Sequence, residues 1–65
     1  MNNGHPLLYS IPEFAAAHRI SRTQIYREIG SGRLIASKIG KRTVITAENA
    51  TAWRAGLPVL VLGVR

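Results

Sequence analysis

The sequence predicts a small, mainly α-helical α+β fold, with three short helices and a β-hairpin between the second and the third. Two observations predict it. A serine or threonine with the spacing of a helix cap precedes each of three segments, at Ser10, Ser21 and Thr46. Between the second and third of these segments, the hydrophobic period changes to that of two short strands around a glycine-containing turn. With only 65 residues, the chain forms a single domain over residues 1–65.

The first helix is predicted over residues 11–18. Ser10 and Glu13 have the spacing of a capping box, in which each side chain satisfies a free backbone N–H group of the other residue. Tyr9 and Phe14 are placed for a hydrophobic staple across the same helix start. Together these signals fix where the helix begins.

The second helix is predicted over residues 22–29. Ser21 and Gln24 repeat the capping-box spacing, and the helix is expected to stop at Gly30. Because only about three residues separate this helix from the first, the two are expected to pack at a large angle, as in a helix-turn-helix.

The hairpin is predicted from two apolar-rich segments, 34–39 and 43–45, on either side of a turn with a basic tip. Thr46 then caps the third helix, predicted over residues 47–55 and ended by Gly56.

Two segments flank the predicted fold, which spans residues 10–55. Residues 1–6 are polar and are expected to be disordered. Residues 57–65 form an apolar tail, in which five of the six residues 57–62 are apolar. One interpretation has this tail folding back over the thin core; the other has it contacting a second copy or a protein partner.

The basic residues are concentrated in one part of the chain. The formal net charge is +6, and Glu28 is the sole acid between residues 19 and 42. Seven of the nine Lys and Arg residues lie in that interval: Arg19, Arg22, Arg27, Arg33, Lys38, Lys41 and Arg42. A concentrated positive face favours a nucleic-acid partner, the alternative being a solvated basic surface.

Several function classes are excluded or disfavoured by composition. Without cysteine there is no disulfide, no thiolate zinc site and no catalytic thiol, and a total of three acids disfavours a carboxylate dyad. His5 and His18 are too far apart in sequence to suggest a metal site. We therefore expect no enzyme activity, no cofactor, no metal and no small-molecule ligand.

The second helix carries the residues best suited to reading DNA. Ile25 and Ile29 define its buried stripe, and Arg22, Thr23, Gln24 and Arg27 lie away from that stripe. Arginine pairs with guanine and glutamine with adenine in the major groove. The alternative is an ordinary solvent-exposed helix face.

The predicted hairpin adds a second set of cations. Lys41 and Arg42 lie at its turn and Lys38 lies nearby, which suits contact with the phosphate backbone or the minor groove. The alternative is that these charges protect edge strands from pairing with another sheet. A helix-turn-helix followed by a basic hairpin has the layout of a winged helix-turn-helix.

Residues 10–53 resemble the small excisionase-type helix-turn-helix domains of the MerR-related winged-helix superfamily. The resemblance covers about two thirds of the chain without gaps. It is carried by Ile11-Pro12-Glu13-Phe14-Ala15-Ala16, Ile20-Ser21-Arg22-Thr23-Gln24-Ile25-Tyr26-Arg27, Gly32-Arg33-Leu34, Lys38-Ile39-Gly40-Lys41-Arg42, Ile45 and Trp53. It implies groove contacts by Ser21, Arg22, Thr23, Gln24 and Arg27, a phosphate contact by Tyr26, and contacts of the hairpin by Lys41 and Arg42.

Two residues depart from that family pattern. Arg19 stands where the family often has glycine in the turn between the helices. A left-handed backbone there costs a residue such as Arg about 1 kcal/mol, so a different turn is expected. Ala50 replaces a core leucine on the last helix, which leaves Trp53, an expected core residue, to fill more of the space.

The resemblance implies a non-catalytic, sequence-specific protein that binds double-stranded DNA. The role we expect is that of an excisionase, a recombination directionality factor that binds and bends attachment-site DNA and works with an integrase or with further copies of itself. The alternatives are a small transcriptional regulator of a prophage or mobile element and, more distantly, an RNA-binding module. No signal peptide or membrane span is expected, which suggests the cytosol. The resemblance implies a bacterial cell and association with the nucleoid.

Overall fold

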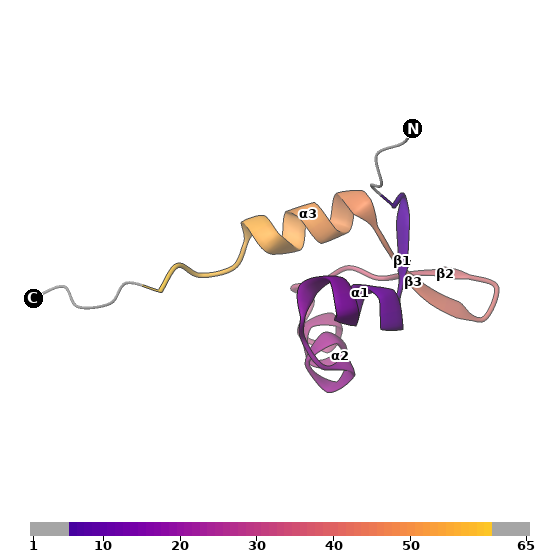
Figure 1. Cartoon of the computed structure of the whole chain (residues 1–65), viewed down its shortest axis with the longest axis horizontal. Helices are drawn as coiled ribbons and strands as arrows, with labels where there is room; N and C mark the ends of the chain where they lie inside the picture. The colour runs from indigo at the N-terminus through magenta and orange to yellow at the C-terminus, as the bar shows by residue number, and fades with distance from the viewer. Residues whose placement is uncertain (1–5, 61–65) are drawn as a thin grey trace, which may run out of the picture.

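The computed structural model describes residues 6–60. Within that range the chain forms three helices and one three-stranded antiparallel sheet (Figure 1). In chain order the elements are β1 (Leu8–Ser10), α1 (Ile11–His18), α2 (Arg22–Gly30), β2 (Ser37–Ile39), β3 (Arg42–Thr46) and α3 (Ala47–Ala55). The predicted α+β class, with a hairpin between the second and third helices, is confirmed.

The helices begin where the capping residues predict. The Ser10 hydroxyl accepts a hydrogen bond of 3.2 Å from the Glu13 backbone N–H, and the Glu13 carboxylate accepts one of 2.8 Å from the Ser10 backbone. Tyr9 and Phe14 meet edge to face with ring centroids 5.6 Å apart, which confirms the staple. Thr46 caps α3 by accepting a hydrogen bond of 3.1 Å from Asn49 N–H.

The start of α2 forms only half of its predicted capping box. The Ser21 hydroxyl accepts a hydrogen bond of 3.0 Å from the Gln24 backbone N–H. The Gln24 side chain does not turn back to Ser21, because its amide donates instead to Glu28. The prediction of a reciprocal Ser21–Gln24 box was wrong in that respect.

The sheet has the order β1-β3-β2, so β3 is its central strand. Strand β1, which the sequence analysis did not predict, pairs with the end of β3 through Tyr9 opposite Ile45. The strand predicted over residues 34–39 is shorter than expected. Its first residue, Leu34, is fully buried and donates its backbone N–H to the Glu28 carbonyl at 3.1 Å, which keeps it out of the ladder.

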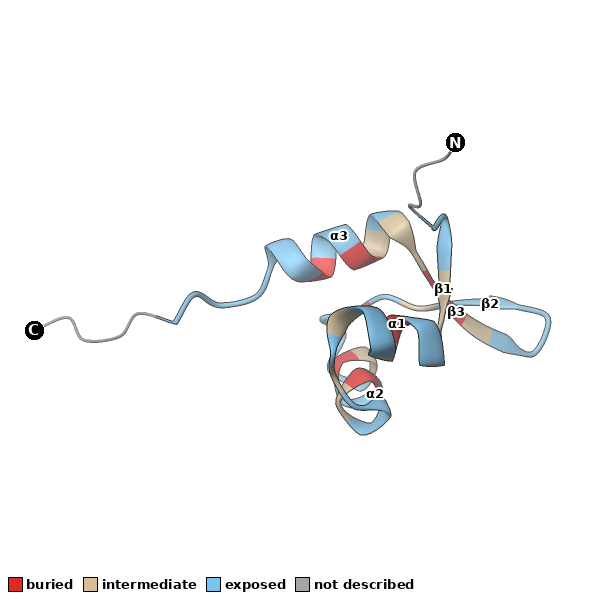
Figure 2. Cartoon of the chain, viewed as in Figure 1, coloured by how far each residue is buried: buried red, intermediate tan, exposed pale blue. Residues whose placement is uncertain are grey.

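The core lies between the sheet and the three helices (Figure 2). It is formed by Ile11, Phe14, Ile25, Leu34, Ile45, Ala50 and Trp53. The expected core position of Trp53 is confirmed, and Ala50 is fully buried beside it. On α2 the buried stripe differs from the prediction, because Glu28 is buried while Ile29 is only half-buried.

The turn between α1 and α2 keeps the left-handed conformation that arginine disfavours. Arg19 has φ 58° and ψ 43°, and its backbone N–H donates to the Ala15 carbonyl at the end of α1. The Ile20 N–H donates to the same carbonyl at 3.2 Å. The expectation of a different turn at Arg19 was therefore wrong: hydrogen bonds at the helix end hold the strained residue in place.

The C-terminal tail leaves α3 and runs away from the body of the protein as far as it is described (Figure 1). Val59 is 85% exposed and Leu60 is 78% exposed. For residues 57–60, the interpretation that the tail folds back over the core was wrong. Residues 61–65 lie outside the described part of the chain, as do residues 1–5, which make up most of the N-terminal segment expected to be disordered.

Candidate nucleic-acid interface

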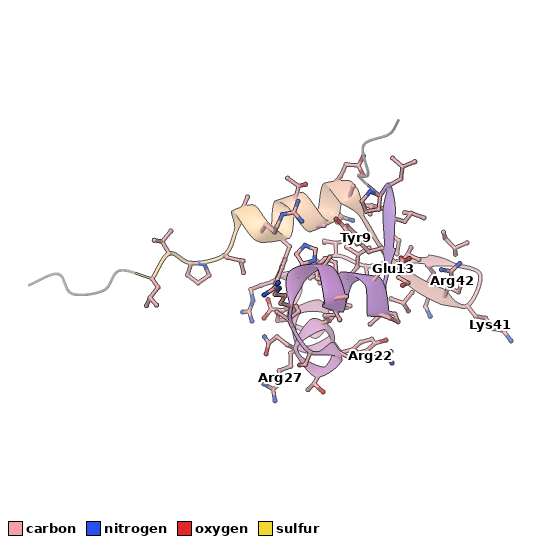
Figure 3. The ribbon with its side chains drawn as sticks, in the orientation of Figure 1. Tyr9, Glu13, Arg22, Arg27, Lys41 and Arg42 are labelled. Carbon is pink, nitrogen blue, oxygen red and sulfur yellow. The ribbon has the colours of Figure 1, made fainter. Side chains whose placement is uncertain are left out.

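The outer face of α2 is polar, basic and open to solvent. Of the residues predicted to contact DNA from this helix, Ser21, Arg22, Thr23, Tyr26 and Arg27 are all exposed. Figure 3 shows Arg22 and Arg27 projecting from different flanks of α2. The structure therefore brings these residues together on one helix and leaves their donors free to meet a ligand.

Gln24 differs from the other predicted contact residues. It is half-buried, and its Nε2 donates a hydrogen bond of 2.9 Å to Oε2 of Glu28. Since an ionised carboxylate only accepts hydrogen bonds, this contact uses one of the two amide N–H groups and leaves Oε1 and the second N–H. The contact with adenine predicted for Gln24 can therefore use Oε1 and the second N–H while the first N–H stays on Glu28.

Glu28 is the structural centre of this region, and the sequence analysis missed its role. Its Oε1 accepts hydrogen bonds from Arg33 Nε at 2.9 Å and from Trp53 Nε1 at 3.1 Å. Its Oε2 accepts from Arg33 Nη2 at 3.1 Å and from Gln24. These hydrogen bonds, led by that of Arg33, lower the pKa of the Glu28 carboxyl from 4.5 to about 2. One sequence feature could have revealed this role of Glu28: it is the sole acid between residues 19 and 42, among seven cations.

We call the hairpin formed by β2, Gly40, Lys41 and β3 the wing. Its register places Ile39 opposite Arg42, so the turn between them contains two residues. Gly40 has a φ of 59°, which a turn of this length requires and which glycine adopts without strain. The wing extends from the body of the protein, with Lys41 and Arg42 at its free end (Figure 3).

The three cations of the wing have different surroundings, although all are exposed. Lys38 Nζ donates to the Lys41 carbonyl at 3.3 Å and so also closes the turn. Arg42 lies close enough to α1 that its charge contributes to the lowered pKa of Glu13, after the larger effect of the hydrogen bonds from Ser10. Lys41, at the outermost point, is the cation best placed to meet a phosphate.

His18 closes the end of α1. Its ring stacks on Phe14 with centroids 3.9 Å apart, and its Nδ1 lies 3.0 Å from the Phe14 carbonyl. Its Nε2 lies 2.8 Å from Arg54 Nη1. Since arginine only donates, Nε2 is the acceptor and Nδ1 carries the proton that is donated to Phe14. This confirms the expectation that His18 is a helix-end residue.

Glu28 and its donors Gln24, Arg33 and Trp53 form what we call the Glu28 cluster. A cavity of about 420 Å³ opens beside it. It is lined by Glu28, Arg33, Ala52, Trp53, Gly56, Leu57 and Pro58. The two charged groups on its wall, Glu28 and Arg33, are paired with each other. Within residues 6–60, no three His, Cys, Asp or Glu side chains gather closely enough to hold a metal ion; His5 lies outside that range.

The helices described here, all between residues 6 and 60, lack the length and apolar character that crossing a membrane requires. No protein-family model matches this chain, and no curated protein or solved structure matches it either.

Proposed function

We propose that this protein binds double-stranded DNA in a sequence-specific manner and without catalysis, with α2 in the major groove and the wing on the adjacent backbone or minor groove. The observation that carries the proposal is the presence of two exposed basic surfaces on one small domain. One is the outer face of α2, with Arg22 and Arg27, and the other is the end of the wing, with Lys41.

The face of α2 has the chemistry needed for base readout. Arg22 follows the N-cap directly, and the first turns of a recognition helix are the part that enters the groove. Its guanidinium matches O6 and N7 of guanine in a bidentate contact. Ser21 and Thr23 add hydroxyls and Arg27 adds a second guanidinium for the groove, while Tyr26 contacts a phosphate oxygen.

The Glu28 cluster supports this role by fixing α2 on the body of the protein. Glu28 is buried and ties α2 to Trp53 of α3 and to Arg33. A recognition helix that is anchored to the core by buried side chains keeps its base-contacting residues in one geometry, and specific recognition needs that geometry. Gln24 then offers its Oε1 as an acceptor to the amino group of adenine or cytosine.

Within this function we propose the role of an excisionase, which binds and bends attachment-site DNA together with an integrase or further copies of itself. The resemblance of residues 10–53 to excisionase-type domains supports this role. Acting on attachment sites implies a location in the bacterial cytosol, with the nucleoid. A protein that bound its site and altered transcription, but neither bent DNA nor changed the direction of recombination, would instead be a small regulator.

The proposal is tested by fluorescence anisotropy with labelled duplex DNA, single-stranded RNA and double-stranded RNA of equal length. We expect binding to duplex DNA, with an affinity that falls as salt rises because Lys and Arg displace counterions. Arg54→Ala is the matched control, since Arg54 is a surface arginine already engaged by His18 and Thr51. Preferential binding to RNA, or equal weakening by Arg54→Ala and Arg22→Ala, would contradict the proposal.

A further inference from the structure

The end of the wing carries an apolar side chain among its cations. Ile39 is the last residue of β2, is 51% exposed, and lies outside the hydrophobic core. Residues 37–43 contain three cations and no acid. About half of this isoleucine stays open to water, which an apolar side chain disfavours, so its setting differs from that of an ordinary core residue.

The register of the hairpin places Ile39 beside a cation. Directly opposed residues of an antiparallel pair lie on the same face, with Cβ atoms about 5 Å apart. Ile39 is opposite Arg42, while Lys38 is opposite Thr43 on the other face. The free end of the wing therefore presents one apolar side chain next to a guanidinium, with Lys41 at the turn beside them.

We propose that Ile39 is a wedge that enters between two stacked base pairs of the minor groove when the wing docks on DNA. This inference rests on the proposed function and names the residue that performs the bending. Apolar side chains inserted in this way unstack a base step and kink the duplex by about 20–90° toward the major groove. Lys41 and Arg42 bind the phosphates on either side, and burial of the isoleucine between bases removes its apolar surface from water.

The charge of the surroundings favours DNA over a protein as the occupant of this site. An exposed isoleucine beside Arg42, with Lys41 at the turn, complements a surface with phosphates at its edges and apolar bases between them. The exposed apolar residue Ile35, which is 58% exposed, lies in the segment before β2 and outside this cluster. It has similar exposure without the same charge setting, and it serves as the matched control.

The experiment uses the full chain and a duplex that it binds. DNA bending is measured by energy transfer between the duplex ends, and unstacking by the fluorescence of 2-aminopurine placed at successive steps under the wing. Ile39→Thr keeps the β-branch that suits the strand but is shorter and polar, so the wing is expected to fold and bind. We expect Ile39→Thr to lose the 2-aminopurine signal and most of the bend, Ile39→Leu to retain both, and Ile35→Thr to behave as the wild type.

The outcomes separate the wedge from the proposed function. If the wild type and Ile39→Thr bend and unstack the duplex equally, or if the wild type does neither while binding tightly, the wedge is wrong and DNA binding stands. If the wild type does not bind duplex DNA at all, the proposed function fails and the wedge fails with it.

Discussion

The indole N–H of Trp53 on α3 donates a hydrogen bond of 3.1 Å to Oε1 of Glu28 on α2, joining residues 25 positions apart in the sequence. Both side chains are buried, and the same carboxylate also accepts from Arg33. This hydrogen bond fixes α2, the proposed recognition helix, against α3. The basic exposed face of α2, which we propose binds DNA, is thus separate from Glu28, which attaches the helix to the core.

Trp53→Phe should lower the stability of the fold. The substitution keeps an aromatic ring in the core but removes the N–H that Glu28 accepts. We expect the free energy of unfolding to fall by about 1–3 kcal/mol, because a buried acceptor then lacks one of its donors. Urea denaturation followed by circular dichroism measures this, since Trp53 is the sole tryptophan and its fluorescence is lost in the variant. Unchanged stability would show that the hydrogen bond contributes nothing.

Stability should decrease in acid because of Glu28. The folded state lowers the pKa of this carboxyl from 4.5 to about 2, so its stabilising contribution is fully present above pH 4.5 and is lost as the pH falls toward 2. The pKa of Glu13 is lowered as well and acts in the same direction, so a comparison with Glu28→Gln is needed to isolate Glu28.

In that comparison we expect Glu28→Gln to be less stable than the wild type near neutral pH. The two free energies of unfolding should converge as the pH falls from 4.5 to about 2, where the wild-type carboxyl gains its proton. Denaturation at a series of pH values provides the measurement. Parallel curves over that range would mean that Glu28 is not the titrating group.

Arg22→Ala should reduce sequence discrimination. If Arg22 reads a guanine, its loss weakens binding to the preferred site by about 1–3 kcal/mol and binding to random duplex far less. Competition binding with the two duplexes gives both values. Equal losses on the two would mean that Arg22 contacts the backbone and not a base.

Lys41→Ala should weaken binding to all sequences alike. A phosphate contact at the end of the wing contributes counterion release, so the slope of log K against log salt should fall by about one. The matched variant is Arg42→Ala, at a cation whose charge also acts on the Glu13 carboxylate, and its slope should change less. An unchanged slope for Lys41→Ala would remove the wing from the phosphate-binding surface.

Features that depend on neighbours in sequence could be predicted. The bounds of α1 and α3 follow from Ser10, Thr46 and the residues that end each helix, and the structure has them where the sequence predicts. The same holds for the position of the hairpin, whose turn depends on Gly40. Each of these signals acts over a few residues, so tertiary contacts do not alter it.

Features that depend on distant partners could not be predicted. Strand β1 has only three residues, too few to show an alternating pattern, and it forms because β3 offers an edge to it. Glu28 is buried because Trp53 and Arg33 supply donors to it, which the helical period of α2 does not reveal. The hydrogen bond from Gln24 to the same carboxylate sets the orientation of the Gln24 amide.

Selection of bound duplexes from a random pool is the most direct test of the central claim, that α2 reads DNA sequence. We predict recurrent enrichment of one short motif containing a guanine, and loss of discrimination at that guanine when Arg22→Ala is used in the selection. The control variant Arg54→Ala should recover the wild-type motif. A pool in which no sequence is enriched by the wild-type protein would contradict sequence-specific recognition by this helix.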